Sequence, residues 1–189
     1  GGEIKIESEE GTVWNSGTIE AIGTEQQGGH VEVLGERVAL LDEASIDASG
    51  ETDGGEIFVG GDYQGKNDDV KNAKQTYVGE NTSIKADAAT NGDGGKVIVW
   101  ADETTQAYGV ITARGGSESG DGGFVETSGK VYLDVSGSSV DASAVNGERG
   151  MWLLDPNNIE IVAGGGNVNI NAATPFVSTN DTAQLGVTL

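Results

Sequence analysis

Pairs of glycines recur along the chain, each followed by one variable residue and one β-branched residue. They occur as GGEI at position 1, GGHV at 28, GGEI at 54, GGKV at 94 and GGFV at 122, with a degenerate copy, RGMW, at 149. The intervals are 27, 26, 40, 28 and 27 residues, so the third copy is about 13 residues too long. A period of this length indicates stacked repeats, because one copy alone cannot bury its apolar face.

A second column of residues keeps the same register. It consists of Ile19-x-Ala21, Ile46-x-Ala48, Ile84-x-Ala86, Ile111-x-Ala113 and Val140-x-Ala142. These stand 18, 18, 30, 17 and 18 residues after their glycine pairs, so the excess of the third copy falls between its two columns. The sequence therefore predicts a local insertion at residues 61–74, GDYQGKNDDVKNAK.

Apolar residues within each copy alternate with polar ones at a period of two, which is typical of β-strands. The first strand of successive copies carries Ile4/Ile6, Val31/Val33, Ile57/Val59, Val97/Val99, Val125/Thr127 and Trp152/Leu154. A middle strand is marked by Val13, Leu40 and Val78, each six residues before the isoleucine column, with a slip to Tyr108 and Leu133 in the last two copies. Three short strands in each copy, and no stretch with a helical period, predict an all-β chain.

Stacking such copies in one direction places equivalent strands side by side as a parallel β-helix, a solenoid of about six turns and roughly 29 Å at about 4.8 Å per turn. The glycine pairs are expected to supply the positive φ of a tight corner. Pro156 cannot donate to a strand ladder and marks a boundary, beyond which the composition becomes nearly uncharged. We therefore predict a solenoid over 1–162, and a cap or the start of a following β module over 163–189.

The net charge of −21, from 31 acidic and 10 basic residues among 189, would repel phosphates, so a nucleic-acid partner is not expected. No apolar run reaches the length of a membrane span, and no targeting segment is recognisable at the start. The absence of cysteine excludes disulfides, thiol nucleophiles and cysteine metal sites.

Four stretches resemble the filamentous haemagglutinin family, the large exoproteins of bacterial two-partner secretion. They are GGEIFVGGDYQGKN (54–67), GDGGKVIVWADETT (92–105), ARGGSESGDGGFVETSGK (113–130) and GMWLLDPNNIEIV (150–162). The resemblance implies a right-handed β-helix, passage through an outer-membrane transporter, and a role in adhesion, aggregation or biofilm formation. The chain looks like an internal segment of such a protein, because the family's amino-terminal secretion domain is not recognised in it.

Three aspartates, Asp53, Asp93 and Asp121, each directly precede a glycine pair and would stack on neighbouring turns. Carboxylates about 4.8 Å apart repel one another, and a calcium ion with oxygen ligands could relieve that repulsion. The simpler interpretation is turn chemistry, in which each carboxylate accepts backbone amide hydrogens of its own loop. Calcium is the only cofactor for which the sequence offers candidates, and the simpler interpretation requires none.

Alternation sends three aromatic side chains outward, those of Trp14, Tyr77 and Trp100. Exposed rings beside acidic residues would suit a neutral or basic glycan as ligand. Alternatively, the rings cover one another or lie under the insertion. The insertion itself is a candidate recognition loop, since loops on a rigid scaffold often carry binding residues.

No catalytic residue is predicted. His30, the only histidine, occupies the variable outward position of its copy and is expected to be a solvated surface side chain. With 31 acidic residues, carboxylate pairs arise by chance, and nothing singles out one pair for acid–base chemistry.

The leading hypothesis is a non-enzymatic segment of a secreted bacterial surface adhesin, which displays binding surfaces on a β-helical rod. Its partners would be a surface glycan, exopolysaccharide or protein receptor, and an outer-membrane transporter during export. The alternatives are a carbohydrate-active β-helix enzyme, and an inert spacer within a longer chain whose binding lies elsewhere.

Overall fold

Sixteen short strands coil into a parallel β-solenoid in the computed structural model, which describes residues 1–155. The first sheet contains β1 (Glu3–Glu7), β4 (His30–Leu34), β7 (Glu56–Val59), β10 (Lys96–Ala101), β13 (Phe124–Gly129) and β16 (Met151–Leu153). The second contains β2 (Thr12–Asn15), β5 (Arg37–Leu40), β8 (Gln75–Val78), β11 (Thr104–Ala107) and β14 (Tyr132–Asp134). The third contains β3 (Thr18–Glu20), β6 (Ser45–Asp47), β9 (Ser83–Lys85), β12 (Val110–Thr112) and β15 (Ser139–Asp141).

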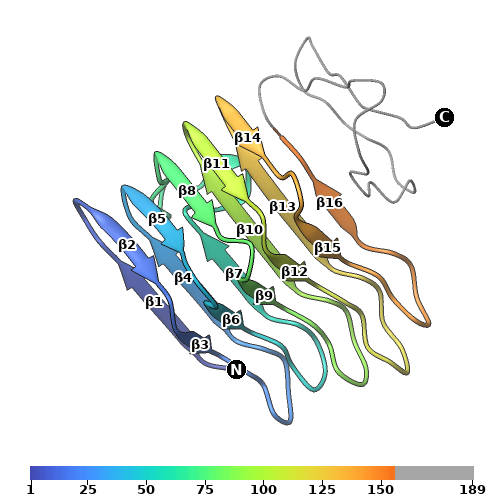
Figure 1. Cartoon of the computed structure of the whole chain (residues 1–189). Coiled ribbons are helices and arrows are strands. Elements are labelled where there is room, and N and C mark those ends of the chain that lie inside the picture. Colours follow the sequence, from blue (N-terminus) through green and yellow to red (C-terminus); the bar gives the residue numbers. More distant parts are fainter. Residues whose placement is uncertain (156–189) are drawn as a thin grey trace, which may run out of the picture.

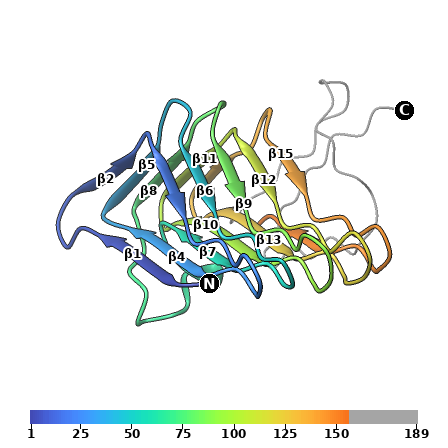
Figure 2. The same cartoon turned by 90° about the horizontal axis from the view of Figure 1, so that it is seen from below.

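The three sheets form the walls of a coil of five complete turns, and β16 begins a sixth (Figure 1). Figure 2 shows the same coil from below, with β1 and the last strands at opposite ends. This confirms the all-β solenoid with three strands in each turn. The predicted boundary at 163–189 lies outside the described residues.

The predicted columns of the first and third strands are confirmed by the strand registers. Ile4, Val31, Ile57, Val97, Val125 and Trp152 pair in one continuous row. Ile19, Ile46, Ile84, Ile111 and Val140 form another, and the described members of both rows pack into one core. Each fully buried Ile or Val contributes about 2 kcal/mol to stability, so the narrow interior holds the turns together.

The middle-strand register predicted for the first copy is wrong by two residues. Val13 pairs with Val38, while Leu40 pairs with Asn15. The connection from the second to the third strand is longer in the second turn, where Asp42 adopts a positive φ of 54°. Counting back from the isoleucine column therefore misplaces Val13.

The slip of the middle strand in the fourth copy also differs from the prediction. Thr105 and Ala107 occupy the inward positions of β11, and Tyr108 lies just beyond that strand. Leu133 does fall in the inward column, opposite Thr105. Thr105 and Thr76 can replace aliphatic residues there because their hydroxyls donate hydrogen bonds to the Ser128 and Trp100 carbonyls, at 2.7 and 2.6 Å.

An arm follows the third strand of each turn, leaving the coil and returning to the first sheet (Figure 1). A hydrogen bond closes the base of each arm, from the second glycine of a pair to an alanine carbonyl, as from Gly55 N to Ala48 O at 2.8 Å. Neighbouring arms stack through parallel bridges such as Gly23 to Gly50 and Gly50 to Ala88.

The predicted reason for the glycine pairs is wrong. Positive φ angles occur at Gly60, Gly61, Gly65, Gly92, Gly120 and Gly137, none of which belongs to the repeated pairs. The pairs instead allow backbones to touch: a Cβ on Gly28 would lie 1.8 Å from the Ala48 carbonyl oxygen, and one on Gly122 would lie 1.9 Å from that of Ala142. Close approach of adjacent turns is therefore what selects glycine there.

Candidate functional site

The insertion folds back over the outer face of the first sheet. It contains a short 3₁₀ turn, η1 (Tyr63–Gly65), which contacts β10. Beneath it lies a second apolar cluster outside the coil, formed by Phe58, Ile98 and Trp100 with Phe124 packed against them. The segment therefore covers apolar side chains that the sheet would otherwise expose to water.

Trp100 points outward from the coil, as predicted, but its ring is covered and not available to a ligand. It is only 4% exposed, and a Cβ on Gly65 would lie 2.5 Å from its indole ring. Its indole nitrogen donates to Asp102 at 3.2 Å. The alternative weighed above, that the ring lies under the insertion, holds for this residue.

Contacts from the insertion reach turns well beyond its own. Lys71 Nζ donates to the carbonyls of Ser8 and Glu9 in the first turn. At the other end, Gln64 Nε2 donates to Asp155 Oδ2 at 2.9 Å, just after β16. The insertion thus ties both ends of the described coil together.

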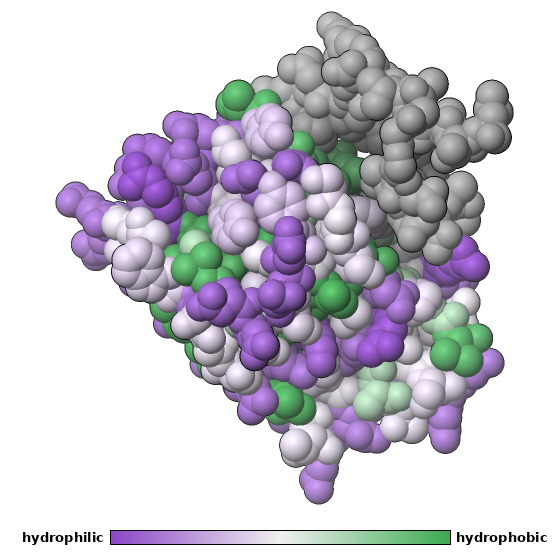
Figure 3. All heavy atoms as spheres, in the orientation of Figure 1, coloured by the Kyte–Doolittle hydropathy of each residue, from purple (hydrophilic) through white to green (hydrophobic). Residues whose placement is uncertain are grey.

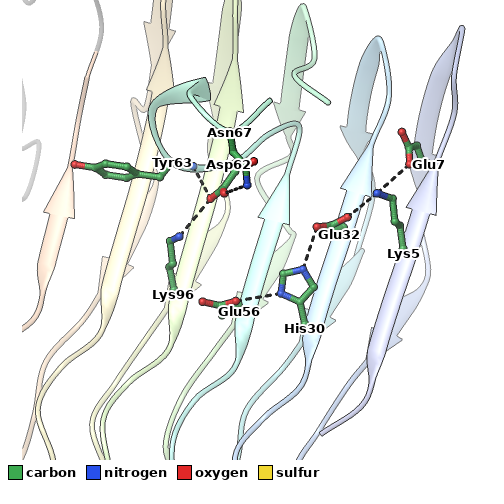
Figure 4. Close-up of polar contacts among 9 residues, drawn as sticks. All are labelled: Lys5, Glu7, His30, Glu32, Glu56, Asp62, Tyr63, Asn67 and Lys96. Atoms are coloured by element: carbon green, nitrogen blue, oxygen red, sulfur yellow. Dashed lines mark hydrogen bonds and ion pairs between the residues drawn. The ribbon is translucent and has the colours of Figure 1, made fainter. Parts of the chain in front are cut away.

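A row of charged side chains crosses the outer face of the first sheet (Figure 4). Lys5 Nζ lies 3.1 Å from both Glu7 and Glu32, and the His30 ring bridges Glu32 and Glu56 at 3.1 and 3.2 Å. Burial opposes ionisation of Glu32, but hydrogen bonds from His30 and Lys5 leave its pKa below the usual value. His30 also packs edge-on against Phe58 at 4.9 Å, so it is more tightly held than the predicted solvated side chain.

Asp62 holds the insertion to the sheet. Its carboxylate accepts from Asn67 Nδ2 at 2.8 Å and pairs with Lys96 at 3.3 Å, as Figure 4 shows. Burial works against ionisation of Asp62, yet the hydrogen bonds from Asn67 and the Tyr63 amide, together with Lys96, lower its pKa. The Lys96 ammonium in turn lies 4.8 Å from the Phe58 ring centre, which adds a cation–π contact.

Glu126 is fully buried on the same face, beneath Gln64. Burial raises the pKa of Glu126 to about 7. Hydrogen bonds from Ser128 and the Gln64 amide act to lower this pKa, whereas the negative charge of Asp155 raises it further. A carboxyl group with such a pKa can act as a general acid when substrate reaches it. Here the insertion seals it, so no substrate can approach it in this conformation. The sequence did not single out Glu126, because its burial depends on the docked insertion.

The predicted aspartate row exists, and it forms a ladder of hydrogen bonds between turns. Asp53 Oδ1 accepts from the Asp93 amide at 3.0 Å, Asp93 Oδ1 from the Asp121 amide at 2.7 Å, and Asp121 Oδ1 from the Glu148 amide at 2.7 Å. The carboxylates accept amides of the next turn and not of their own loop. Among residues 1–155, no three Asp, Glu or His side chains are grouped to hold a metal ion.

The other two predicted aromatic residues lie on the outer face of the second sheet. Trp14 is 73% exposed, while Tyr77 is half-buried and packs edge-on against Tyr108 at 5.9 Å. The register places Ala39 between Trp14 and Tyr77 in one outward column. The small alanine leaves a hollow beside Tyr77, of about 260 Å³.

On the face shown in Figure 3, polar side chains dominate the described surface and apolar residues form small separate patches. Among the described residues, no helix is long and apolar enough to cross a membrane.

A comparison with solved structures identifies a similar protein. The chain resembles the crystal structure of the HMW1 secretion domain from Haemophilus influenzae, with 35% sequence identity and a TM-score of 0.69. The match covers 81% of this chain but only 39% of that domain. No family model matches the chain, and no curated protein matches it significantly. The similarity is to a secretion domain, a region that the sequence alone did not suggest.

Proposed function

We propose that this chain is a segment of a secreted bacterial surface adhesin, exported by two-partner secretion, that acts in adhesion, aggregation or biofilm formation. The observation that carries the proposal is the 35% identity to a secretion domain over 81% of the chain, on a shared solenoid architecture. A solenoid offers a long outer surface built on a rigid core, which suits display of binding groups at a distance from the cell.

Such a segment would act by holding binding groups at fixed positions on a rigid scaffold. The buried aliphatic rows hold the turns in register, while outward side chains and the docked insertion present the contacts. The net charge of −21 keeps neighbouring rods apart at low ionic strength, and salt reduces this repulsion. The partners would be an outer-membrane transporter during export and a glycan, exopolysaccharide or protein receptor at the surface.

A second candidate function is a direct role in export, because the similar solved structure is a secretion domain. The segment would then form part of the region that engages the transporter. Only this second candidate requires the segment for export, so the two candidates make opposite predictions about export.

The two candidate functions can be distinguished by removing one turn from the full-length protein in cells that carry its transporter. Deletion of residues 29–54 joins Gly28 to Gly55, which occupy adjacent places in the repeated glycine pair. Protein in the medium and on the surface is measured first, then cell adhesion and aggregation. Lost export supports the secretion role, and retained export with lost adhesion supports the display role. If both are retained, the segment is a spacer and its proposed adhesive role is rejected.

The enzymatic alternative is tested on the purified chain with polysaccharide substrates. We expect neither new reducing ends nor unsaturated products, because Glu126 is sealed beneath the insertion. Product formation that disappears in Glu126→Gln would establish catalysis.

A further inference from the structure

The hollow on the second sheet has an unusual lining for so acidic a chain. Ala39 forms its floor, Tyr77 one wall, and Arg37, Gln75 and Gln106 surround it. All five are strand residues of β5, β8 and β11, so a flat and regular backbone holds them. Within the described chain, none of the residues that line the hollow is acidic.

Arg37 is the only charged residue in this lining. Its guanidinium makes no ion pair or side-chain hydrogen bond with any residue of 1–155, although the chain has three times as many acidic as basic residues. The adjacent Glu36 is held instead by Lys74. Five guanidinium donors therefore remain available at the edge of the hollow.

The lining is rich in donors and poor in strong acceptors. Arg37 adds only donors, and the free amide of Gln75 supplies both donors and an acceptor. Gln106 Nε2 already donates to the Tyr108 hydroxyl at 2.8 Å, which fixes its side chain. A ligand that fits must bring acceptors, and a carboxylate is the group that a planar guanidinium binds best.

Aromatic side chains in and near the hollow add an apolar surface. Tyr77 lines the hollow, and the highly exposed Trp14 stands in the same outward column on the other side of Ala39. Two turns separate these residues, which is about 9.6 Å between their backbones. That spacing admits one sugar ring, whose CH face packs against an aromatic side chain.

We propose that this hollow binds a sugar residue that carries a carboxylate, of the uronic acid class. The aromatic side chains contact the ring, Arg37 pairs with the carboxylate, and Gln75 binds a hydroxyl. Glu36 lies near enough for its charge to interact with that of Arg37, but it is paired with Lys74, and more distant acidic groups are screened beyond about 8 Å at physiological salt. The inference deepens the proposed adhesive function and rests on it, and it replaces the neutral or basic glycan expected from sequence.

The test is calorimetric titration of the purified full chain with two matched trisaccharides, one ending in glucuronic acid and the other in glucose. We expect the acidic sugar to bind roughly 10-fold more tightly, the effect of one hydrogen-bonded charge pair at a partly exposed site. Arg37→Gln should remove this preference, and Tyr77→Ala should weaken both sugars.

Arg149→Gln is the matched control, since it removes the same charge from an exposed residue of an arm. It should bind both sugars as the unmodified chain does, and thermal melts should show each variant folded. Equal affinity for the two sugars, or an unchanged preference in Arg37→Gln, would overturn the proposal. Binding in solution without adhesion by cells would instead reject the proposed function and leave the sugar site standing.

Discussion

At the residue scale, the repeated glycines are required by contact between the backbones of adjacent turns and not by a left-handed conformation. Trp14 and Trp100 look alike in the sequence, since each follows an inward valine, yet one is exposed and the other buried. Whether an outward side chain meets solvent depends on what covers its sheet.

Replacement of Gly28 by alanine should destabilise the chain by about 2–3 kcal/mol, the usual cost of overpacking. The new methyl group would lie 1.8 Å from the Ala48 carbonyl oxygen, which is itself fixed by the closing bond of its arm. Gly17→Ala is the control, because its Cβ would have no neighbour nearer than 3.7 Å. Thermal unfolding followed by circular dichroism gives the melting temperature of each variant. Equal melting temperatures would contradict the explanation that close backbone contact requires glycine at position 28.

Trp100→Ala should cost about 3 kcal/mol, because it leaves a cavity under the insertion and removes the hydrogen bond to Asp102. Trp14→Ala should change the free energy of unfolding by less than about 0.5 kcal/mol, as for other surface substitutions. Denaturant titration of the two variants makes the comparison. A large loss for Trp14→Ala would mean that the exposed ring is covered in solution.

At the element scale, the insertion and the aspartate ladder both join separate turns. The insertion was expected as a candidate recognition loop, but it packs along the first sheet and contacts both ends of the described coil. The aspartates stack as predicted, and each carboxylate binds an amide of the following turn. Both features make the stability of one turn depend on others.

The buried Glu126 should make the chain less stable as the pH rises. Its pKa is about 7 in the folded chain against 4.5 ordinarily, so the folded state binds its proton more tightly. The stabilising contribution is complete below pH 4.5 and is lost as the pH rises through about 7. At 1.36 kcal/mol per pKa unit the loss is about 3 kcal/mol.

Glu126→Gln should remove this loss, because the amide stays neutral while retaining an oxygen for the Gln64 backbone N–H. The measurement is the free energy of unfolding of both chains at pH 5 and pH 8. The free energy of unfolding should decrease more between pH 5 and pH 8 for the unmodified chain than for the variant. An equal decrease in the two chains would show that Glu126 ionises normally and that the insertion does not seal it.

Asp93 allows a comparison of the hydrogen-bond ladder with a calcium site. Asp93→Asn keeps an acceptor oxygen for the Asp121 amide, whereas Asp93→Ala does not. If the ladder acts through hydrogen bonds, only the alanine variant should be destabilised, by about 1 kcal/mol. Melting temperatures with millimolar calcium and with chelator test the other possibility, since a rise of several degrees that both variants abolish would establish metal binding.

At the scale of the whole molecule, the stacked turns should be removable as units. Deletion of residues 29–54 leaves β1 facing β7 with equivalent residues aligned, so the shortened chain should fold. Circular dichroism and cooperative unfolding should therefore be retained. The opposite result would show that turns are not interchangeable.

Much of this architecture follows from the sequence alone. The glycine period, the isoleucine column and the two-residue alternation determine an all-β solenoid, its first and third sheets and the place of its insertion, because each is a local pattern repeated at fixed intervals. The middle strand was harder to place, since the connection after Leu40 is longer than that after Asn15.

Only the tertiary structure decided the features that depend on distances between turns. The close backbone contact at Gly28, the burial of Trp100 and Glu126, and the hollow between Arg37 and Tyr77 all arise where residues remote in sequence meet. A repeat pattern specifies which residues point outward. It does not specify which of them a folded-back segment will cover, because that depends on packing and charge pairing across several turns at once.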